Sequence, residues 1–148
     1  MIGLGSDHGG FQLKEVLKAH LEERGFEVKD YGIYTEEACD YPDIAETVAH
    51  AVADGECERA ILICGTGIGV SMSANKVRGI RAACVSDCFS AKLTREHNDA
   101  NILCMGGRVV GPGLACMIAD AYLDAQFEGG RHQIRVDKIM AIEERERG

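Results

Sequence analysis

The stretch RAILICG (59–65) restricts the possible folds of this chain more than any other feature. Its apolar residues are continuous rather than alternating with polar ones, as expected for a strand covered on both faces of a parallel sheet. Four more short strand-like segments are separated from it and from one another by segments with helical spacing of apolar residues. Five strands alternating with helices predict an α/β fold, with a parallel, doubly wound, Rossmann-like sheet and helices on both faces.

The same pattern gives expected bounds for the elements. We expect strands at 2–7, 27–32, 59–65, 80–87 and 101–107. We expect helices at 11–25, 42–55, 88–99, 113–127 and 131–147, and a short helix that ends at residue 74. A chain of 148 residues can surround one core and no linker divides it, so we expect a single domain over 1–148.

Composition and charge argue against several classes of partner. The net charge of −8 and an aromatic content of 5% without Trp argue against binding to nucleic acid or to anionic membranes. No apolar run approaches the roughly 18 residues that a transmembrane helix needs, and the first ten residues lack the pattern of a signal peptide. We therefore expect a cytoplasmic protein with no nucleic-acid or membrane partner.

The seven cysteines match neither a disulfide framework nor a metal site. Their number is odd, no CxxC pair occurs, and the CxxxC at Cys84 and Cys88 has no second ligand pair nearby. We therefore expect no metal. Cys84, Cys104 and Cys116 lie in apolar runs, where free cysteine usually acts as a small buried hydrophobic side chain.

The turn CGTGIG (64–69) follows the most apolar strand and opens a helix, so its backbone N–H groups can converge on an anion or an oxyanion. It is not a Walker A loop, because no Gly-Lys-Ser/Thr follows it. Val70 occupies the position where a dinucleotide-binding turn has glycine or alanine, and where a tyrosine-phosphatase loop has arginine. Asp87 ends the next strand, where a ribose-binding acid would lie, so a nucleotide-binding site remains an alternative. A further alternative is that residues 64–69 form only a tight turn and bind no ligand.

Five further side chains are candidates for chemistry. Cys64 lies at the N-terminus of the expected short helix, which favours the thiolate, although a buried structural cysteine is the alternative. His8 and His97 flank strand ends beside glycine or asparagine turns, and we interpret both as functional. Arg131 and Arg135 lie one turn apart at a helix start, which fits a phosphate site as well as a solvated face.

Six motifs follow one another along the chain: GSDHGGF (5–11), DYPD (40–43), ILICGTGIG (61–69), EHNDAN (96–101), GGRVVG (106–111) and EGGRHQIR (128–135). Together they resemble the type B ribose-5-phosphate isomerase family, which also includes allose-6-phosphate and galactose-6-phosphate isomerases. The resemblance extends from residue 1 to about residue 147. It implies a three-layer α/β/α sandwich around a five-stranded parallel sheet, in agreement with the strand count.

The resemblance also implies a role for each matched residue. Cys64 matches the base that moves the proton, and His97 the residue that helps to open the furanose ring. Some members use a loop carboxylate instead of the cysteine, but Val70 and Ser71 offer none here. Asp7 matches a sugar-binding position, and it counts as catalytic too because it can assist ring opening. The remaining matched positions are substrate contacts, the arginines mainly to phosphate: His8, Gly65, Thr66, Gly67, Ile68, Gly69, Asn98, Arg108, Arg131 and Arg135, with Thr66 also a catalytic hydroxyl.

The function implied is that of an aldose–ketose isomerase acting on a sugar phosphate without a cofactor. A base beside the substrate moves one proton between neighbouring carbons, and the glycines let backbone N–H groups approach the enediolate oxygens. We expect a homodimer or a dimer of dimers with shared active sites, in which His97 and Asn98 face Cys64 of another chain. The helix 131–147 is then expected at a subunit interface. A hexose-6-phosphate isomerase and a non-catalytic module that binds phosphosugars or nucleotides remain alternatives, although binding alone needs neither Cys64 nor His97.

Overall fold

The computed structural model describes residues 1–147 and contains five strands and six helices in alternation. The strands are β1 (Ile2–Ser6), β2 (Val28–Asp30), β3 (Arg59–Cys64), β4 (Ala82–Cys84) and β5 (Ile102–Gly106). The helices are α1 (Phe11–Glu23), α2 (Tyr41–Ala53), α3 (Ile68–Ala74), α4 (Cys88–Asn98), α5 (Pro112–Asp124) and α6 (Arg131–Arg147). The predicted order of elements is confirmed.

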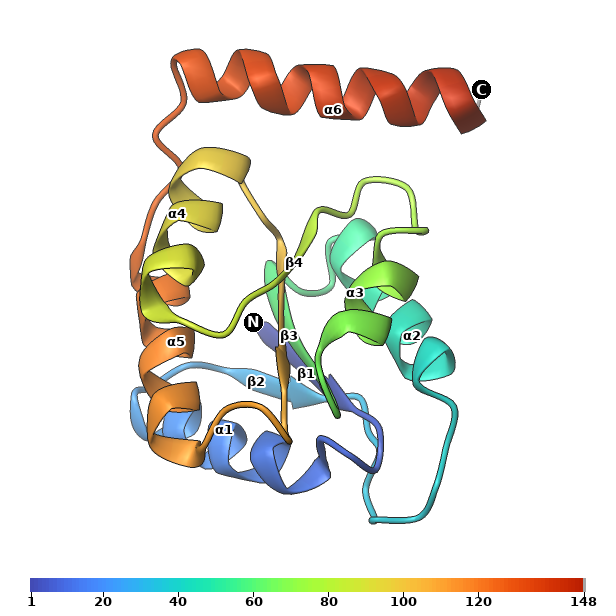
Figure 1. Ribbon diagram of the computed structural model, residues 1–148, viewed down its shortest axis with the longest axis vertical. Coiled ribbons are helices and arrows are strands. Elements are labelled where there is room, and N and C mark those ends of the chain that lie inside the picture. Colours follow the sequence, from blue (N-terminus) through green and yellow to red (C-terminus); the bar gives the residue numbers. More distant parts are fainter. Residues whose placement is uncertain (148) are drawn as a thin grey trace.

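The strands form one parallel sheet in the order β2-β1-β3-β5-β4. Helices α1, α4 and α5 cover one face of this sheet, and α2 and α3 cover the other (Figure 1). The predicted three-layer α/β/α sandwich is therefore correct. No helix among residues 1–147 is long and apolar enough to cross a membrane.

Strand β3 shows why its sequence is continuously apolar. Ile61 and Ile63 join the core on the side of α1 and α5, whereas Leu62 and Cys64 join the core on the side of α2 and α3. The isoleucines and Leu62 are fully buried. A strand in the middle of a sheet that is covered on both faces cannot carry a polar side chain without loss of hydration, so both sets of positions are apolar.

Three helices begin at residues that favour a helix start. Pro42 lies in the first turn of α2 and Pro112 is the first residue of α5, where proline loses no helical hydrogen bond. Asp87 precedes α4, and its carboxylate accepts a hydrogen bond from the N–H of Ser90 at 2.7 Å. Asp87 is therefore a helix cap in the structure. The sequence alone had left open a second role for it, as an acid that binds a ribose.

The two edge strands are shorter than predicted. Strand β2 pairs with β1 over three residues, and β4 pairs with β5 over three residues, because each has a neighbour on only one side. The prediction that Cys84 is buried is wrong. It ends the edge strand β4 in an exposed position, with its sulfur 3.7 Å from the carbonyl oxygen of Thr66. Cys104, on the central strand β5, is fully buried as predicted, and Cys116 is half-buried.

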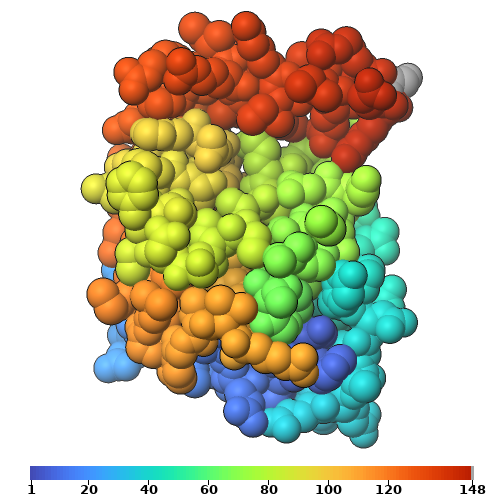
Figure 2. Space-filling model, viewed as in Figure 1, coloured from blue at the N-terminus to red at the C-terminus, as the bar shows by residue number. Residues whose placement is uncertain are grey.

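Helix α6 lies apart from the two covering layers. It crosses the end of the molecule at which α4 ends, and its side chains form a ridge there (Figures 1 and 2). Polar contacts fix it to the body: Arg78 donates to Glu144 at 2.5 Å, and the N–H of Gly79 donates to Glu143 at 3.1 Å. Three apolar side chains of α6 stay about half exposed or more, namely Ile134, Ile139 and Ile142.

Candidate active site

The carboxyl ends of the strands carry three backbone segments in close contact, which we call the glycine cradle: Gly9 and Gly10 after β1, Gly65 to Gly69 after β3, and Gly106 and Gly107 at the end of β5. The N–H of Gly107 donates to the carbonyl oxygen of Cys64 at 2.8 Å, which ties the last two turns together. A Cβ atom on Gly107 would lie 2.5 Å from the carbonyl oxygen of Gly9, and one on Gly106 would lie 2.7 Å from the backbone of Thr66. These contacts leave room for glycine only.

Gly67 needs glycine for a second reason. Its φ of 83° lies in the left-handed region, and an added Cβ atom would lie 2.7 Å from the backbone of Met105. Gly69 is covered by the ring of Tyr41, from which an added Cβ atom would be 2.5 Å away. Tyr41 therefore closes the turn from the side of α2. Tyr41 was not predicted as a site residue, although it lies inside the DYPD motif.

A pocket of about 380 Å³ opens above the glycine cradle. Its lining comes from the ends of β1 and β3 and from α2 and α3: Asp7, Tyr41, Cys64, Gly65, Thr66, Ile68, Gly69 and Met72. Cys64 lines this pocket and is otherwise almost completely buried, with 5% of its surface exposed. The N–H of Gly67 donates to its sulfur at 3.1 Å. A thiol with an N–H donor directed at it and a pocket in front of it is suited to taking up and releasing a proton.

The other residues predicted at this edge also lie around the cradle. Asp7 is buried, and its Oδ1 accepts hydrogen bonds from the N–H groups of Gly9 at 2.9 Å and Gly10 at 3.2 Å. His8 is exposed, and its Nδ1 accepts from the N–H of Cys39 at 3.3 Å, which leaves Nε2 as a possible donor toward a ligand. Arg108 is exposed beside Gly65, so its guanidinium can reach an anion at the mouth of the pocket.

The second group of predicted residues lies where α4 ends and α6 begins, and we call it the histidine corner: His97, Asn98, Glu128, Arg131, His132 and Arg135. The rings of His97 and His132 are stacked, with centroids 4.1 Å apart and an angle of 9° between the planes. The Nε2 atoms lie 3.5 Å and 3.4 Å from Oε1 of Glu128. Burial lowers the pKa of His132, and the neighbouring His97 and Arg131 lower it further.

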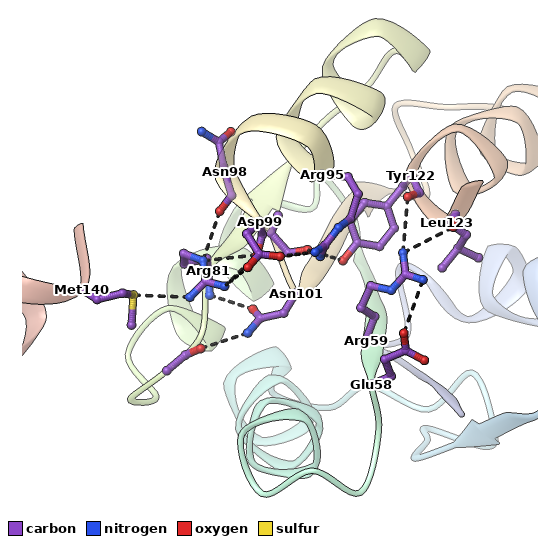
Figure 3. A network of polar contacts seen from close by, with 12 residues as sticks. Glu58, Arg59, Arg81, Arg95, Asn98, Asp99, Asn101, Tyr122, Leu123 and Met140 are labelled. Atoms are coloured by element: carbon purple, nitrogen blue, oxygen red, sulfur yellow. Dashed lines mark hydrogen bonds and ion pairs between the residues drawn. The ribbon is translucent and has the colours of Figure 1, made fainter. Parts of the chain in front are cut away.

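A network of hydrogen bonds holds the turn that presents Asn98 (Figure 3). Asp99 ends α4 with a φ of 49°, and Arg81 donates to its carbonyl oxygen at 2.8 Å and to that of Asn98 at 3.1 Å. The carbonyl oxygen of Ala100 accepts from Arg95 and from Tyr122, both at 2.6 Å. Neither these arginines nor Tyr122 were predicted as site residues, and Arg81 and Tyr122 are distant in sequence from the EHNDAN motif that they support.

Within one chain, the glycine cradle lies at the carboxyl ends of the strands and the histidine corner lies at their amino ends (Figure 1). Helix α4 runs antiparallel to the strands, so it ends at the amino edge, whereas Cys64 ends β3 at the carboxyl edge. Strand β5, with five residues and a length of roughly 16 Å, extends from one edge to the other. The structure thus brings Asp7, Cys64 and Thr66 together, and keeps His97 and Arg131 apart from them.

Among residues 1–147, the side chains that could hold a metal ion are His97, Glu128 and His132, whose potential ligand atoms all lie within 4.8 Å of one another. The glycine cradle contains no comparable group within the same range of residues. Its chemistry is that of a thiol, a carboxylate, a hydroxyl and backbone N–H groups around a pocket. The fold and this site define a doubly wound α/β protein with a pocket suited to a small ligand at the carboxyl ends of its strands.

Comparison with known proteins identifies the family. Residues 2–139 match the family model described as ribose/galactose isomerase, and the chain belongs to that family. The chain is 58% identical over 144 residues to ribose-5-phosphate isomerase B of Escherichia coli strain K12, covering 97% of each chain. Membership of this family and similarity over nearly the whole length make the chain an isomerase, as predicted.

Solved structures agree with this assignment. Ribose-5-phosphate isomerase B of Clostridium thermocellum superposes with a TM-score of 0.96 at 55% identity, covering 97% of each chain. Ribose-5-phosphate isomerase B of Mycoplasma genitalium, solved with bound ribulose-5-phosphate, gives a TM-score of 0.92 at 46% identity, covering 97% of this chain and 95% of that one. The resemblance inferred from the six motifs is therefore confirmed.

Proposed function

We propose that this chain interconverts ribose 5-phosphate and ribulose 5-phosphate through an enediolate. The observation that carries the proposal is the sulfur of Cys64, which faces a pocket and accepts the N–H of Gly67 at 3.1 Å. The M. genitalium relative was solved with ribulose-5-phosphate, which supports a sugar phosphate as the ligand. A five-carbon phosphate contains the two groups that the predicted residues are suited to bind, a phosphate and a carbonyl next to a hydroxyl.

In this mechanism the thiolate of Cys64 removes the proton from carbon 2 of the open-chain aldose. The electron pair of the broken C–H bond forms the carbon 1–carbon 2 double bond, and negative charge moves to the oxygen of carbon 1. The N–H groups of the glycine cradle stabilise that oxygen, with the hydroxyl of Thr66 beside them. Cys64 returns the proton to carbon 1 while the hydroxyl proton of carbon 2 passes to the oxygen of carbon 1, which leaves the ketose. Oxidation of one carbon balances reduction of the other, so no redox cofactor takes part.

Ring opening and phosphate binding need residues that one chain keeps away from Cys64. We propose that His97 and Asn98 of a second copy complete the pocket, with His97 passing the ring proton and Arg131 and Arg135 binding the phosphate together with Arg108. The exposed apolar side chains of α6 support this arrangement, because Ile134, Ile139 and Ile142 would otherwise stay in water. Helix α6 would then lie at the interface of a homodimer or a dimer of dimers.

Mixing two inactive variants tests the shared site directly. Cys64→Ala and His97→Ala would be unfolded together, refolded as a mixture and assayed against each variant treated alone. In a dimer with shared sites, half of the refolded molecules are hybrids in which one of the two sites has both residues, so about a quarter of wild-type activity should return. No recovery in a mixture shown by mass spectrometry to contain hybrids would mean that each site lies within one chain.

The substrate assay separates this proposal from its alternatives. Purified protein would be incubated with ribose 5-phosphate, allose 6-phosphate and galactose 6-phosphate, and kcat/KM would be compared for the three. The proposal requires ribose 5-phosphate to be the best substrate, and a hexose phosphate with a higher kcat/KM would make the chain a hexose-6-phosphate isomerase. Tight binding of the phosphates without any turnover would make it a non-catalytic module.

The state of the cysteines bears on where the protein works. All seven cysteines are free, which supports a reducing compartment, and we propose the cytoplasm.

A further inference from the structure

Asp99, at the end of α4, has a backbone conformation that needs support. Among residues 1–147 it is the only non-glycine residue with a positive φ, at 49°. It follows His97 and Asn98 directly, so the direction in which α4 ends determines where these two side chains lie. A non-glycine residue persists in the left-handed region where neighbouring contacts hold it, and such residues cluster at functional sites. The contacts that hold Asp99 are therefore candidates for a role in the reaction.

The side chain of Arg81 binds the backbone of this turn (Figure 3). Its Nη2 donates to the carbonyl oxygen of Asp99 at 2.8 Å, and its Nε donates to the same oxygen at 3.2 Å and to that of Asn98 at 3.1 Å. The last carbonyl oxygens of a helix have no partner within the helix, and a guanidinium offers its donors in a fixed plane. Arg95 pairs with the carboxylate of Asp99. Arg81 thus holds the backbone of the turn, and Arg95 holds its side chain.

The position of Arg81 is itself fixed by the EHNDAN motif. Its N–H donates to Oδ1 of Asn101 at 2.8 Å, and its carbonyl oxygen accepts from the N–H of Asn101 at 3.0 Å. The side-chain amide of Asn101 also donates to the carbonyl oxygen of Gly79 at 2.9 Å. Only 19% of the Arg81 side chain is exposed. Because both its backbone and its side chain are bound to residues 98–101, we expect a change at Arg81 to displace the end of α4.

Arg81 also connects the end of α4 with α6. Its Nη1 lies 3.4 Å from the sulfur of Met140 on α6. The ring of His97 stacks on that of His132 at the start of the same helix, with 4.1 Å between the centroids. The orientation of His97 therefore depends on how α4 and α6 are placed relative to each other, and Arg81 contacts both helices.

We propose that Arg81 is a positioning residue for the isomerase reaction, which orients His97 by holding the end of α4 against α6. The inference rests on the proposed function, in which His97 passes the ring proton. Arg81 takes up no proton itself, because a guanidinium stays charged in proteins. Loss of its planar fork is expected to turn the imidazole of His97 away from the ring oxygen, and a misplacement of about 1 Å can lower a rate by about 10²-fold.

Arg59 provides a matched control at the end of another helix. Its Nη1 lies 3.5 Å and 3.4 Å from the carbonyl oxygens of Tyr122 and Leu123, near the end of α5. Its side chain is 15% exposed, close to the value for Arg81. Arg59→Lys and Arg81→Lys therefore keep the charge and remove the same planar fork from a helix end, and only the second does so beside His97.

The kinetic test compares these two variants under conditions where urea unfolding shows both to be fully folded. We expect kcat for ribose 5-phosphate to fall at least fivefold in Arg81→Lys and less than twofold in Arg59→Lys. Exchange of the carbon-1 proton of ribulose 5-phosphate with deuterated water needs Cys64 and no ring opening, so it should slow less than twofold in both. A smaller fall in Arg81→Lys, an equal fall in Arg59→Lys, or exchange slowed as much as turnover would overturn the proposal. If Arg81→Lys does not fold, Arg81→Gln and Arg59→Gln replace the pair under the same criteria.

A double variant shows whether Arg81 acts through His97. If it does, adding Arg81→Lys to His97→Ala should lower turnover of ribose 5-phosphate less than twofold further, because the group that Arg81 orients is already absent. A further fall as large as in the wild-type background would mean that Arg81 acts independently of His97, which contradicts the proposal.

The position of the His97 ring can also be followed without any activity. The NMR signal of its Cε1 proton, assigned by its loss in His97→Ala, is shifted by the stacked ring of His132. We expect this signal to move in Arg81→Lys and to stay in place in Arg59→Lys, and an unchanged signal in Arg81→Lys would refute the positioning role. If the wild type shows no isomerase activity, the proposed function fails, and this comparison still decides whether Arg81 sets the position of the ring.

Discussion

The glycine cradle and the histidine corner are built by opposite means. The cradle is made of backbone against backbone, with Gly107 meeting Gly9 and Gly106 meeting Thr66 at distances that exclude a side chain. The corner is made of long side chains, in which Arg81 fixes the end of α4 and Glu128 faces two imidazoles. The cradle therefore gains its geometry from the sheet itself, whereas the corner depends on interactions of side chains that can move.

The two regions also differ in how many parts of the proposed site each holds within one chain. The cradle holds the proposed base, a pocket and N–H donors within one chain, and these are the parts that the proposed proton transfer on an open-chain sugar needs. The corner has a histidine and arginines, but it lies at the other end of the strands from Cys64 and its pocket (Figure 1). We infer that proton transfer belongs to the cradle, and that ring opening and phosphate binding belong to the corner of a second copy.

The largest effect is expected from Cys64→Ala, which removes the proposed base from the cradle. Substrate binding should remain, because the N–H groups and arginines are untouched, while kcat should fall by about 10²–10⁴-fold if general-base catalysis is lost. Steady-state kinetics with ribose 5-phosphate, and binding measured by calorimetry, would show both. Cys116→Ala, on α5 away from the pocket, is the control and should be near normal. Near-normal turnover of Cys64→Ala would mean that another base acts.

A smaller effect, on stability, is expected from Gly67→Ala. Alanine at a φ of 83° is strained, and its Cβ atom would meet the backbone of Met105 at 2.7 Å. Together these should lower the free energy of unfolding by about 2–4 kcal/mol. Gly113→Ala, in the first turn of α5 with open space around it, should leave stability unchanged or raise it by up to about 1 kcal/mol. Urea unfolding would measure both, and equal stability of the two variants would mean that the cradle is not built of close-packed backbone.

The fold could be predicted from the sequence because the patterns that indicate strands and helices are local. Continuous apolar residues in β3, helical spacing and proline at helix starts each depend on a few neighbouring residues, and they gave the correct order of strands and helices along the chain. The bounds of β2 and β4 were overestimated, since an edge strand ends where its single partner stops pairing. Cys84 was placed in the core because an apolar run does not tell whether its strand is central or at an edge.

The candidate site was less predictable where it depends on packing over long distances in the sequence. The glycines and Cys64 form one local motif, so the cradle could be recognised from residues 64–69 alone. The ring of Tyr41 covers Gly69 only because α2 packs on α3, and Arg81 reaches Asn98 only because β4 lies beside the end of α4. Neither contact has a sequence pattern. Asp87 matched a nucleotide-binding position but serves as a helix cap, since both roles place an acid at the end of a strand.

A still smaller effect is expected from Arg131→Ala in the histidine corner. Loss of a charged hydrogen bond to the phosphate, worth about 1.5–3 kcal/mol, should raise KM for ribose 5-phosphate by roughly tenfold or more with a lesser change in kcat. Arg145→Ala, on the same helix but in its last turn, is the control. An unchanged KM in Arg131→Ala would remove this arginine from the phosphate site and weaken the assignment of phosphate binding to the corner.

The smallest effect is expected where His97→Ala is tested on a reaction that needs no ring opening. Turnover of ribose 5-phosphate, which is mostly cyclic in solution, should fall by about 10²-fold or more as an acid–base group is lost. Because the equilibrium constant ties the two directions of net turnover together, the measurement must be exchange on the ketose alone. Ribulose 5-phosphate cannot close a furanose ring through its phosphorylated carbon, so Cys64 should still exchange its carbon-1 proton with deuterated water. That exchange, followed by mass spectrometry, should slow only a few-fold in His97→Ala and be lost in Cys64→Ala.

His50→Ala is the control, and it should leave both the turnover of ribose 5-phosphate and the exchange on ribulose 5-phosphate unchanged. If His97→Ala slowed exchange and turnover equally, the histidine would act on proton transfer itself, and the division of labour between corner and cradle would be wrong.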